Sequence, residues 1–271
     1  MTDRISGSAF KQMVLFGAAC ITIEREAIND LNVFPVPDGD TGTNMSLTIQ
    51  TAATELKKNQ PVSVSDAASI TASALLRGAR GNSGVILSLL FRGMSKHLKG
   101  MEEADGVRLA GAMKEGVTTA YGAVMKPAEG TVLTVSRLAA DRAAEACNSV
   151  EYVLQEAIRA GQETLAQTID MNPVLKKAGV VDAGGKGYLV ILDGMLRALR
   201  GEAIPEVTGE PAESKADFSA LSEEEITFTF DTVFIVRKWE NTSIEPLRAY
   251  LSTIGDCLVI GEDDEAFKVH V

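Results

Sequence analysis

Cysteine, histidine and aromatic residues are scarce in this sequence. Among its 271 residues there are three cysteines and two histidines, and 5% of the residues are aromatic. Cys20, Cys147 and Cys257 lie far apart and are odd in number, which argues against a disulfide framework and favours a reducing, cytoplasmic compartment. So few histidines and such dispersed cysteines also argue against a structural zinc site. Neither a Cys-His arrangement nor a Gly-x-Ser-x-Gly segment indicates covalent hydrolysis.

Long apolar runs and basic runs are absent as well. No apolar stretch reaches the roughly 18 residues that a membrane span requires, and the first residues do not form an apolar leader. The formal net charge is −11, and no run of Lys and Arg offsets it. That charge opposes binding to nucleic acid or to an anionic lipid surface. With 45% hydrophobic residues the chain can bury a substantial core, so we expect a folded cytoplasmic protein without a membrane span.

The first 200 residues follow a helical pattern. Apolar residues recur at spacings of three and four, and alanine, leucine and methionine are abundant while prolines are few. This predicts a mainly α domain over residues 1–200. We expect Ser65-Asp66 and Asp105 to cap two of its helices. The expected helices span residues 8–29, 45–57, 65–78, 82–97, 105–124, 131–147, 150–168 and 184–200.

The pattern changes after residue 200. Residues 201–221 are rich in Glu, Pro, Gly, Ser and Ala without apolar periodicity, which is typical of a linker. Residues 222–271 are expected to form a short, partial α+β domain. Because about fifty residues bury little core of their own, we interpret the chain as part of a longer protein. Alternation predicts strands at 226–230, 233–236, 258–260 and 267–271, and a helix near 243–254.

Two carboxylates flank a glycine at Asp38-Gly39-Asp40. The prolines just before them restrict the backbone and hold this acidic segment extended. Mg²⁺ takes a few carboxylate or amide oxygens and completes its shell with water and substrate phosphates, so Asp38, Asp40 and Asn32 form a candidate metal site. The alternative is structural, with Asp38 as a turn residue and Asp40 as the N-cap of the helix that starts near Asn44.

Four segments place small, polar or charged residues directly before an expected helix. A helix N-terminus offers backbone N–H groups and a positive dipole end to a phosphate. Arg80, Lys126 and Lys186 are candidate counter-charges for a triphosphate. The alternatives are a ligand-free glycine-rich turn, solvated surface cations, and a purely capping role for Asp182. The segments are residues 38–45, 77–84, 126–131 and 179–187.

Together these segments resemble a known family, the nucleotide-binding domain of dihydroxyacetone-kinase type, in the form found at the front of bacterial fatty acid kinases. Four matching stretches occur in the family's order: residues 32–45 (NVFPVPDGDTGTNM), 79–88 (ARGNSGVILS), 126–131 (KPAEGT) and 181–185 (VDAGG). The resemblance implies an antiparallel barrel of eight amphipathic helices with ATP and Mg²⁺ at one end.

The resemblance also implies roles for single residues. Asn32, Asp38 and Asp40 would hold the metal, and Arg80 or Lys126 would stabilise the transferring phosphoryl group. The residues expected to contact nucleotide or phosphate are Thr41, Thr43, Asn44, Gly81, Asn82, Ser83, Gly84, Gly130 and Thr131, with Asp182 and Gly184 closing the far wall.

The residues after the linker resemble the start of the middle domain of fatty acid kinases. Asp231 stands where that domain often has a cysteine, and the chain ends just after His270, where another histidine is expected. A metal or catalytic role in this second domain is therefore not carried over from the family.

The leading functional hypothesis is transfer of a phosphoryl group from ATP to the carboxylate of a fatty acid. A separate fatty-acid-binding carrier protein would present the acyl substrate, and the products would be an acyl phosphate and ADP. An ionised carboxylate needs no base to activate it, which fits the lack of an obvious catalytic histidine. The alternatives are a kinase for dihydroxyacetone or a related hydroxyketone, and a non-catalytic regulatory module that binds ATP and Mg²⁺. The sequence leaves open whether the protein forms a homodimer.

Overall fold

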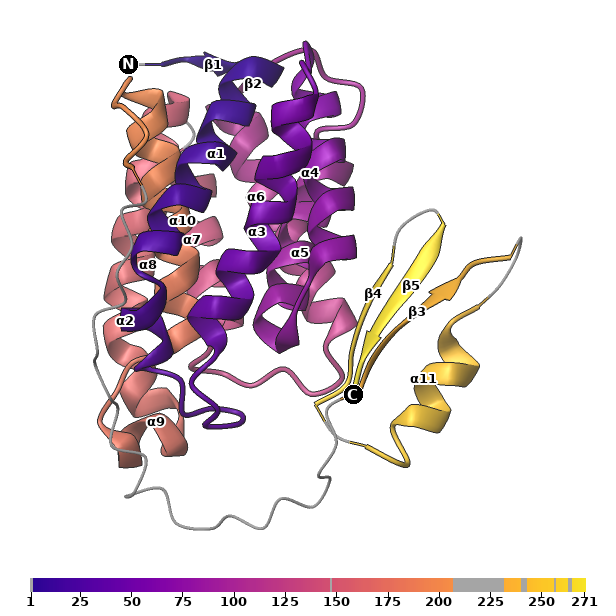
Figure 1. Ribbon diagram of the computed structural model, residues 1–271. Coiled ribbons are helices and arrows are strands. Elements are labelled where there is room, and N and C mark those ends of the chain that lie inside the picture. The colour runs from indigo at the N-terminus through magenta and orange to yellow at the C-terminus, as the bar shows by residue number, and fades with distance from the viewer. Residues whose placement is uncertain (1, 147, 207–231, 240–242, 256, 263–264) are drawn as a thin grey trace.

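A computed structural model describes residues 2–146, 148–206, 232–239, 243–255, 257–262 and 265–271 (Figure 1). The expected strand at 226–230, the residues of the expected linker after 206, and Asp231 lie outside the described residues. The described chain is mainly helical up to residue 199 and continues as a small α+β unit from residue 232, as the sequence predicts.

Eight long helices form the first domain, and each packs against the next along the chain, with α10 closing the ring on α1. Short connections, such as the two residues between α4 and α5, make neighbouring helices antiparallel. The predicted eight-helix barrel is thereby confirmed. The long helices are α1 (Gly7–Ile23), α3 (Thr41–Lys58), α4 (Val64–Gly78), α5 (Gly81–His97), α6 (Gly106–Ala123), α7 (Val132–Ala146), α8 (Val150–Met171) and α10 (Ala183–Leu199).

Two short helices depart from the sequence prediction. The expected helix at 8–29 ends at Ile23 and resumes as α2 (Arg25–Asn29), because Glu24 leaves helical geometry as the C-cap of α1. The helix α9 (Pro173–Ala178) was not expected, although its start carries a recognisable signal. Asn172 caps it by accepting from the backbone N–H of Val174, and a proline occupies its first position.

Side-chain caps explain where several long helices begin. Asp105 accepts from the backbone N–H of Arg108 at 2.9 Å, so the cap predicted there is confirmed. The other prediction is wrong: Ser63, not Ser65-Asp66, caps α4, because its hydroxyl accepts from the backbone N–H of Asp66 at 3.0 Å. The helix expected from residue 45 begins four residues earlier, at Thr41, directly after the acidic loop.

A two-residue antiparallel pair, β1 (Arg4–Ile5) with β2 (Ala104–Asp105), joins the start of α1 to the start of α6. The second domain consists of β3 (Val233–Arg237), α11 (Glu245–Leu251), β4 (Val259–Glu262) and β5 (Ala266–His270). Its three strands are antiparallel in the order β3-β5-β4, so β5 lies in the middle of the sheet.

The second domain has a small core of its own and a connection to the larger one. Leu251, Leu258, Ile260, Phe267 and Val269 form the small cluster, with Met125 of the barrel packed against it. Val259, on β4, instead belongs to the main core of the barrel. The two domains are therefore joined by apolar packing as well as by the chain.

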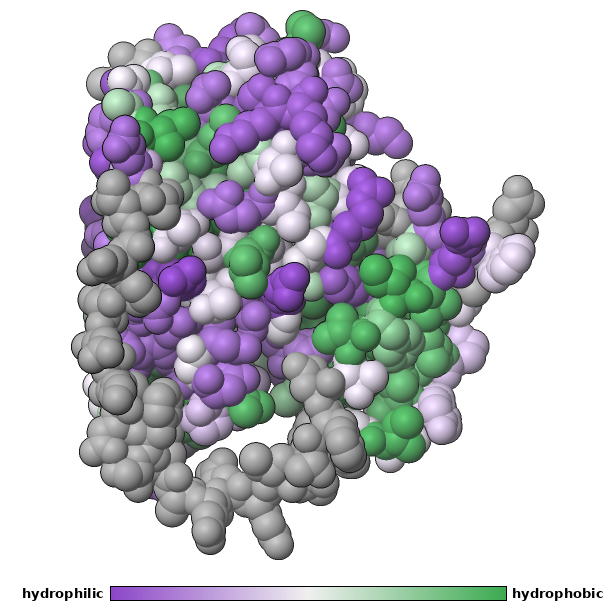
Figure 2. All heavy atoms as spheres, viewed as in Figure 1, coloured by the Kyte–Doolittle hydropathy of each residue, from purple (hydrophilic) through white to green (hydrophobic). Residues whose placement is uncertain are grey.

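Exposed apolar side chains gather over the second domain (Figure 2). On β3, Val233 and Ile235 are 45% and 57% exposed, and Trp239 just after it is 77% exposed. Part of the apolar surface of this domain is thus left uncovered by the described residues. Within the described part of the chain, no helix combines the length and hydropathy needed to cross a membrane.

Candidate functional site

The up-and-down arrangement of the barrel brings the four sequence segments to one end. Since neighbouring helices alternate in direction, every second connection lies at the same end of the barrel. The connections α2–α3, α4–α5, α6–α7 and α9–α10 are those that contain or border the four segments, and Figure 1 shows them at the lower end of the view. Segments more than 100 residues apart in the sequence therefore become neighbours.

Asn32 organises the acidic loop. It is 2% exposed, and its amide nitrogen donates to the Asp38 carboxylate at 2.7 Å and to the backbone oxygen of Val36 at 2.8 Å. The Thr41 hydroxyl donates to the amide oxygen of Asn32. Asn32 thus braces the loop across nine residues, and its oxygen keeps one lone pair for a cation.

The two carboxylates of the loop repel each other. Although the Asp38 side chain reaches solvent, partial burial and the neighbouring Asp40 carboxylate raise the pKa of Asp38 to about 6. Asp40 occupies the N-cap position of α3 without making a side-chain capping hydrogen bond, so the capping alternative is met in position only. The carboxylate of Asp40 is therefore available for a cation.

The donor set fits Mg²⁺ better than a metal held by protein alone. Among the described residues no group of three or more His, Cys, Asp and Glu side chains is arranged to hold a metal ion. Two carboxylates and one amide oxygen leave most of an octahedral shell to water and phosphate oxygens, which is how Mg²⁺ is bound with nucleotides.

The first turn of α3 is fixed by an asparagine that sequence reasoning missed. Asn29, at the end of α2, accepts from the backbone N–H of Thr43 and donates to the Thr43 hydroxyl, both at 3.0 Å. A side chain at Gly42 would stand 2.1 Å from the backbone oxygen of Arg25, so α2 and α3 approach each other closely there. The position of Asn29 at the end of an expected helix was the only signal in the sequence.

The glycines of the α4–α5 turn serve close packing on α3. A Cβ atom at Gly81 would lie 2.4 Å from the Asn44 amide nitrogen, and one at Gly84 would lie 2.4 Å from the Thr48 hydroxyl. Gly81 also has a φ of +57°, which favours glycine. The Thr48 hydroxyl accepts from the backbone N–H of Arg80 at 3.1 Å. The packing role of these glycines is thus visible, and it joins the first two segments.

The third and fourth segments also meet. The backbone N–H of Gly130 donates to the Thr134 hydroxyl at 2.8 Å, and the Thr131 hydroxyl donates to the backbone oxygen of Ala128 at 2.8 Å. A Cβ atom at Gly184 would lie 3.2 Å from the side chain of Val132, just after Thr131. The α6–α7 connection therefore packs directly against the start of α10.

Asp182 is both a helix cap and a wall of the site. Its carboxylate accepts from the backbone N–H of Gly185 at 2.6 Å, which confirms the capping alternative, and its own N–H donates to the Thr168 hydroxyl at 3.1 Å. The residue is 5% exposed, and this burial raises the pKa of Asp182 to about 7.

A cavity of about 290 Å³ lies where the connections converge. Of the residues predicted from the sequence to contact a nucleotide or to act in transfer, six line it: Asn82, Ser83, Lys126, Thr131, Asp182 and Gly184. Phe34 and Pro35 bring the start of the acidic loop to the same cavity, and Ile86, Val132 and Leu133 make much of its wall apolar. An apolar cavity with a few convergent polar groups is typical of a small-molecule site.

The remaining predicted residues lie outside the cavity wall. Arg80 occupies the N-cap position of α5 with an exposed side chain, whereas Lys126 does line the cavity. The structure thus separates the two cations that the sequence could not rank. Those outside the wall are Asn32, Asp38, Asp40, Thr41, Thr43, Asn44, Arg80, Gly81, Gly84 and Gly130.

The second domain contributes to the same cavity, which the sequence did not indicate. Cys257, Leu258 and Val259 line it. The backbone N–H of Met125 donates to the backbone oxygen of Leu258 at 3.3 Å, and Val124 forms an isolated antiparallel bridge with Val259. The cavity is thus closed by both domains.

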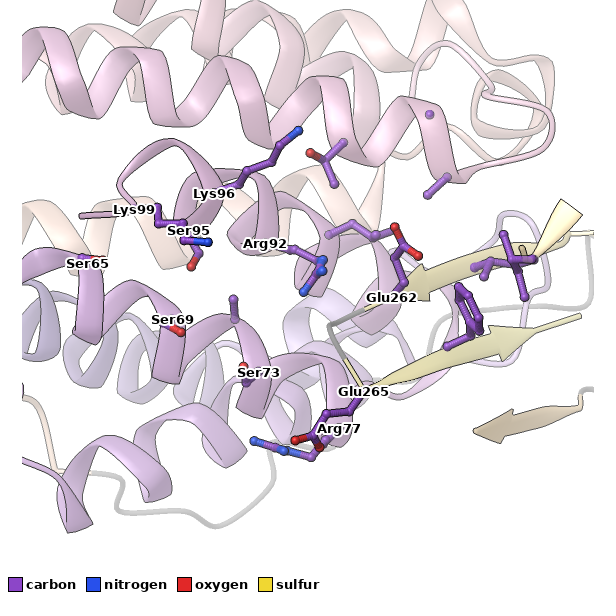
Figure 3. A pocket seen from close by; sticks show the side chains of 18 of the residues that line it. Ser65, Ser69, Ser73, Arg77, Arg92, Ser95, Lys96, Lys99, Glu262 and Glu265 are labelled. Atoms are coloured by element: carbon purple, nitrogen blue, oxygen red, sulfur yellow. The ribbon is translucent and has the colours of Figure 1, made fainter. Parts of the chain in front are cut away.

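A larger cavity, of about 790 Å³, lies between α4, α5 and the second domain (Figure 3). Ser65, Ser69 and Ser73 follow one face of α4 there, with Arg92 and Lys96 on α5. None of the predicted nucleotide- or metal-binding residues lines it. Size alone does not make it the better candidate, because the convergent polar groups lie around the smaller cavity.

Comparison with known proteins agrees with this geometry. Residues 35–197 match the DAK2 domain, and residues 227–271 match the FakA-like middle domain of fatty acid kinase. The chain belongs to the DAK2 domain family, which confirms the resemblance drawn from its sequence.

Its relatives are longer proteins. An uncharacterized protein of Staphylococcus saprophyticus is 39% identical over 287 residues, covering 100% of this chain and 51% of the relative. An uncharacterized protein of Staphylococcus aureus strain RF122 is 39% identical over 283 residues, covering 100% of this chain and 52% of the relative. The chain thus spans about half the length of the curated relatives it matches.

Two solved structures share the fold. The dihydroxyacetone kinase from C. freundii, in complex with AMP-PNP and Mg²⁺, has a TM-score of 0.55 and 19% sequence identity, and the match covers 73% of this chain and 35% of that one. The native form of the same enzyme has a TM-score of 0.54 and 17% identity, with 73% of this chain and 36% of that one covered. At these identities the likeness is one of fold.

Proposed function

We propose that this chain is the nucleotide-binding part of a cytoplasmic kinase that transfers the γ-phosphoryl group of ATP, with Mg²⁺, to the carboxylate of a fatty acid. The observation that carries the proposal is the cavity of about 290 Å³, around which all four glycine-rich or acidic connections converge. The AMP-PNP and Mg²⁺ named for the C. freundii structure support ATP and Mg²⁺ as the ligands.

Each part of the site has a role in this proposal. Asp38 and Asp40, braced by Asn32, are the metal ligands, and bound Mg²⁺ supplies charge neutralisation on the phosphates. The N-terminal backbone N–H groups of α5, at Asn82 and Ser83, face the cavity that would hold the nucleotide. Lys126, which lines the cavity, is the cation placed to stabilise the transferring group.

The acceptor is proposed from the second domain and from the chemistry of the cavity. The match of residues 227–271 to a fatty acid kinase middle domain favours a fatty acid presented by a separate carrier protein. The described residues that line the cavity include no histidine, and a carboxylate acceptor, already ionised near neutral pH, needs no general base. Attack by the carboxylate oxygen on the γ-phosphorus, with ADP leaving, gives an acyl phosphate.

A second candidate is a kinase for dihydroxyacetone or a related hydroxyketone, favoured by the shared fold with the C. freundii enzyme. The deciding experiment is ADP release from ATP and Mg²⁺ with either a fatty acid and its carrier or dihydroxyacetone as acceptor. It should be run on this chain and on a chain of the relatives' full length.

Release of ADP with the fatty acid and carrier, but not with dihydroxyacetone, supports the proposal. The reverse pattern replaces it with the hydroxyketone kinase. Tight ATP binding without turnover by either chain identifies a regulatory nucleotide-binding module.

A further inference from the structure

The middle strand of the second domain faces the turn that carries the candidate phosphate-binding groups. Successive side chains of a strand point to opposite faces of its sheet. On β5, Phe267 and Val269 belong to the small core of the second domain, so Lys268 and His270 project from the opposite face. A Cβ atom at Gly261, paired with Lys268, would lie 2.7 Å from the Leu76 side chain, so that face lies directly against the end of α4.

Lys268 binds the C-terminal end of α4. Its ammonium group donates to the backbone oxygen of Arg77 at 3.3 Å and to that of Ala79. The last carbonyl groups of a helix lack partners within the helix and carry the negative end of its dipole, so a cation is stabilised there. Lys268 is only 6% exposed, and burial together with the nearby Arg80 lowers its pKa. A lysine buried at this cost is explained by the two carbonyl groups that it binds.

His270 binds the first turn of α5. Its Nδ1 lies 2.7 Å from the amide oxygen of Asn82, and since that oxygen only accepts, Nδ1 carries the proton and donates it. His270 is 5% exposed, and Asn82 lines the candidate nucleotide cavity. With its oxygen engaged by His270, the amide of Asn82 presents its NH₂ group as the donor for a ligand.

The turn between these two contacts has little restraint of its own. Gly81 has a φ of +57°, which only glycine adopts readily. Arg80, at the N-cap position of α5, makes no side-chain capping hydrogen bond. The contacts from β5 therefore hold the turn on both sides of its most permissive residue.

We infer that the second domain sets the geometry of the nucleotide site, with Lys268 and His270 acting as positioning residues for the segment from Ala79 to Asn82. The inference rests on the proposed function, because it takes this segment to bind phosphate. Neither residue contacts the ligand in this account. Each acts through the backbone or side chain of the turn.

The test is titration of ATP with Mg²⁺ into the full chain and its variants, well below each melting temperature. Lys268→Met should weaken ATP binding about tenfold or more, because it removes a charged donor from two buried carbonyl groups. Lys268→Arg keeps the donor and should restore most of the affinity. His270→Leu should also weaken binding, whereas His270→Gln retains a donor and should stay close to wild type.

Lys238→Met is the matched control. Lys238 belongs to the same domain and lies over the Phe267 ring at 4.5 Å, away from the turn. Removing it makes the same change in charge and side chain without touching the α4–α5 segment. If the domain acts only by adding stability, Lys238→Met and Lys268→Met will lower ATP affinity alike, and the inference is overturned.

The remaining outcomes separate the inference from the proposed function. If wild type binds ATP and both Lys268→Met and His270→Leu bind it equally well, positioning by β5 is refuted while the kinase proposal stands. If wild type itself fails to bind ATP with Mg²⁺, the proposed function fails first. Should Lys268→Met not fold, the His270→Leu and His270→Gln pair decides the question by the same comparison.

Discussion

Asp182→Asn tests the buried acid at the wall of the cavity. Burial raises the pKa of Asp182 from 3.8 to about 7, so the folded chain binds this proton more tightly than the unfolded chain does. The free energy of unfolding that this group contributes is therefore full below about pH 4 and falls as the pH rises toward 7. Asparagine cannot ionise, so the variant should lose this part of the pH dependence.

The magnitude follows from the pKa difference. A change from 3.8 to about 7 corresponds to at most about 4 kcal/mol above pH 7, at 1.36 kcal/mol for each pKa unit. Asparagine caps a helix about as well as aspartate, so the hydrogen bond from the Gly185 N–H is retained and little offsets the gain. In a chain of this size about 1 kcal/mol moves the melting temperature by roughly 2–4 °C.

The assay is thermal or urea unfolding of wild type and Asp182→Asn at pH 5, 6.5 and 8. Asp182→Asn should be more stable than wild type at pH 8, and the difference should shrink steadily toward pH 5. The raised pKa of Asp38 is common to both proteins and cancels. Asp170→Asn, which removes a carboxylate paired with Lys176 at the exposed end of α8, serves as the control. Parallel pH profiles for Asp182→Asn and wild type would refute the reasoning.

Three further predictions concern the site and the domains. Gly84→Val should lower the melting temperature, since its Cβ would stand 2.4 Å from the Thr48 hydroxyl, and adding Thr48→Ala should recover part of the loss; no recovery would mean that this contact is not the cause. Lys126→Ala should lower ATP turnover by about tenfold or more, whereas Lys186→Ala, at a lysine outside the cavity wall, should not, as measured by ADP release. Residues 1–206 alone should keep the helical circular dichroism of the barrel but bind ATP more weakly than the full chain, because Cys257–Val259 then no longer close the cavity; equal affinity in calorimetry would show that the second domain is not needed.

The helical domain could be predicted from the sequence because its signals are local. Apolar spacing located all eight long helices, and boundaries were wrong mainly where a cap was misread, as at Ser63. The break at Glu24 could not be seen, because the apolar pattern continues from α1 into α2. The start of α9 could have been found from Asn172 and the proline after it, had the pair been read as cap and first turn.

The candidate site was predictable in composition but not in geometry. The four segments could be chosen because glycine and acidic residues stand out between helices, and the alternating barrel then brings them together. Which glycines pack against α3 depends on Asn44 and Thr48, and nothing in the local sequence indicates that contact. The contribution of Leu258 and the contact between His270 and Asn82 join residues more than 100 positions apart, so only the tertiary structure shows them.

Calorimetric titration of ATP in the presence and absence of Mg²⁺ tests the central claim most directly. Wild type should bind ATP with Mg²⁺ and far more weakly without it. Asp38→Asn and Asp40→Asn should each lose the metal-dependent binding with their helical content intact, since both side chains belong to a surface loop outside the core. Asp66→Asn, which removes an exposed carboxylate from the first turn of α4, should bind as wild type does. Unchanged metal-dependent binding in both loop variants would contradict the account and return Asp38 and Asp40 to structural roles in the loop and at the start of α3.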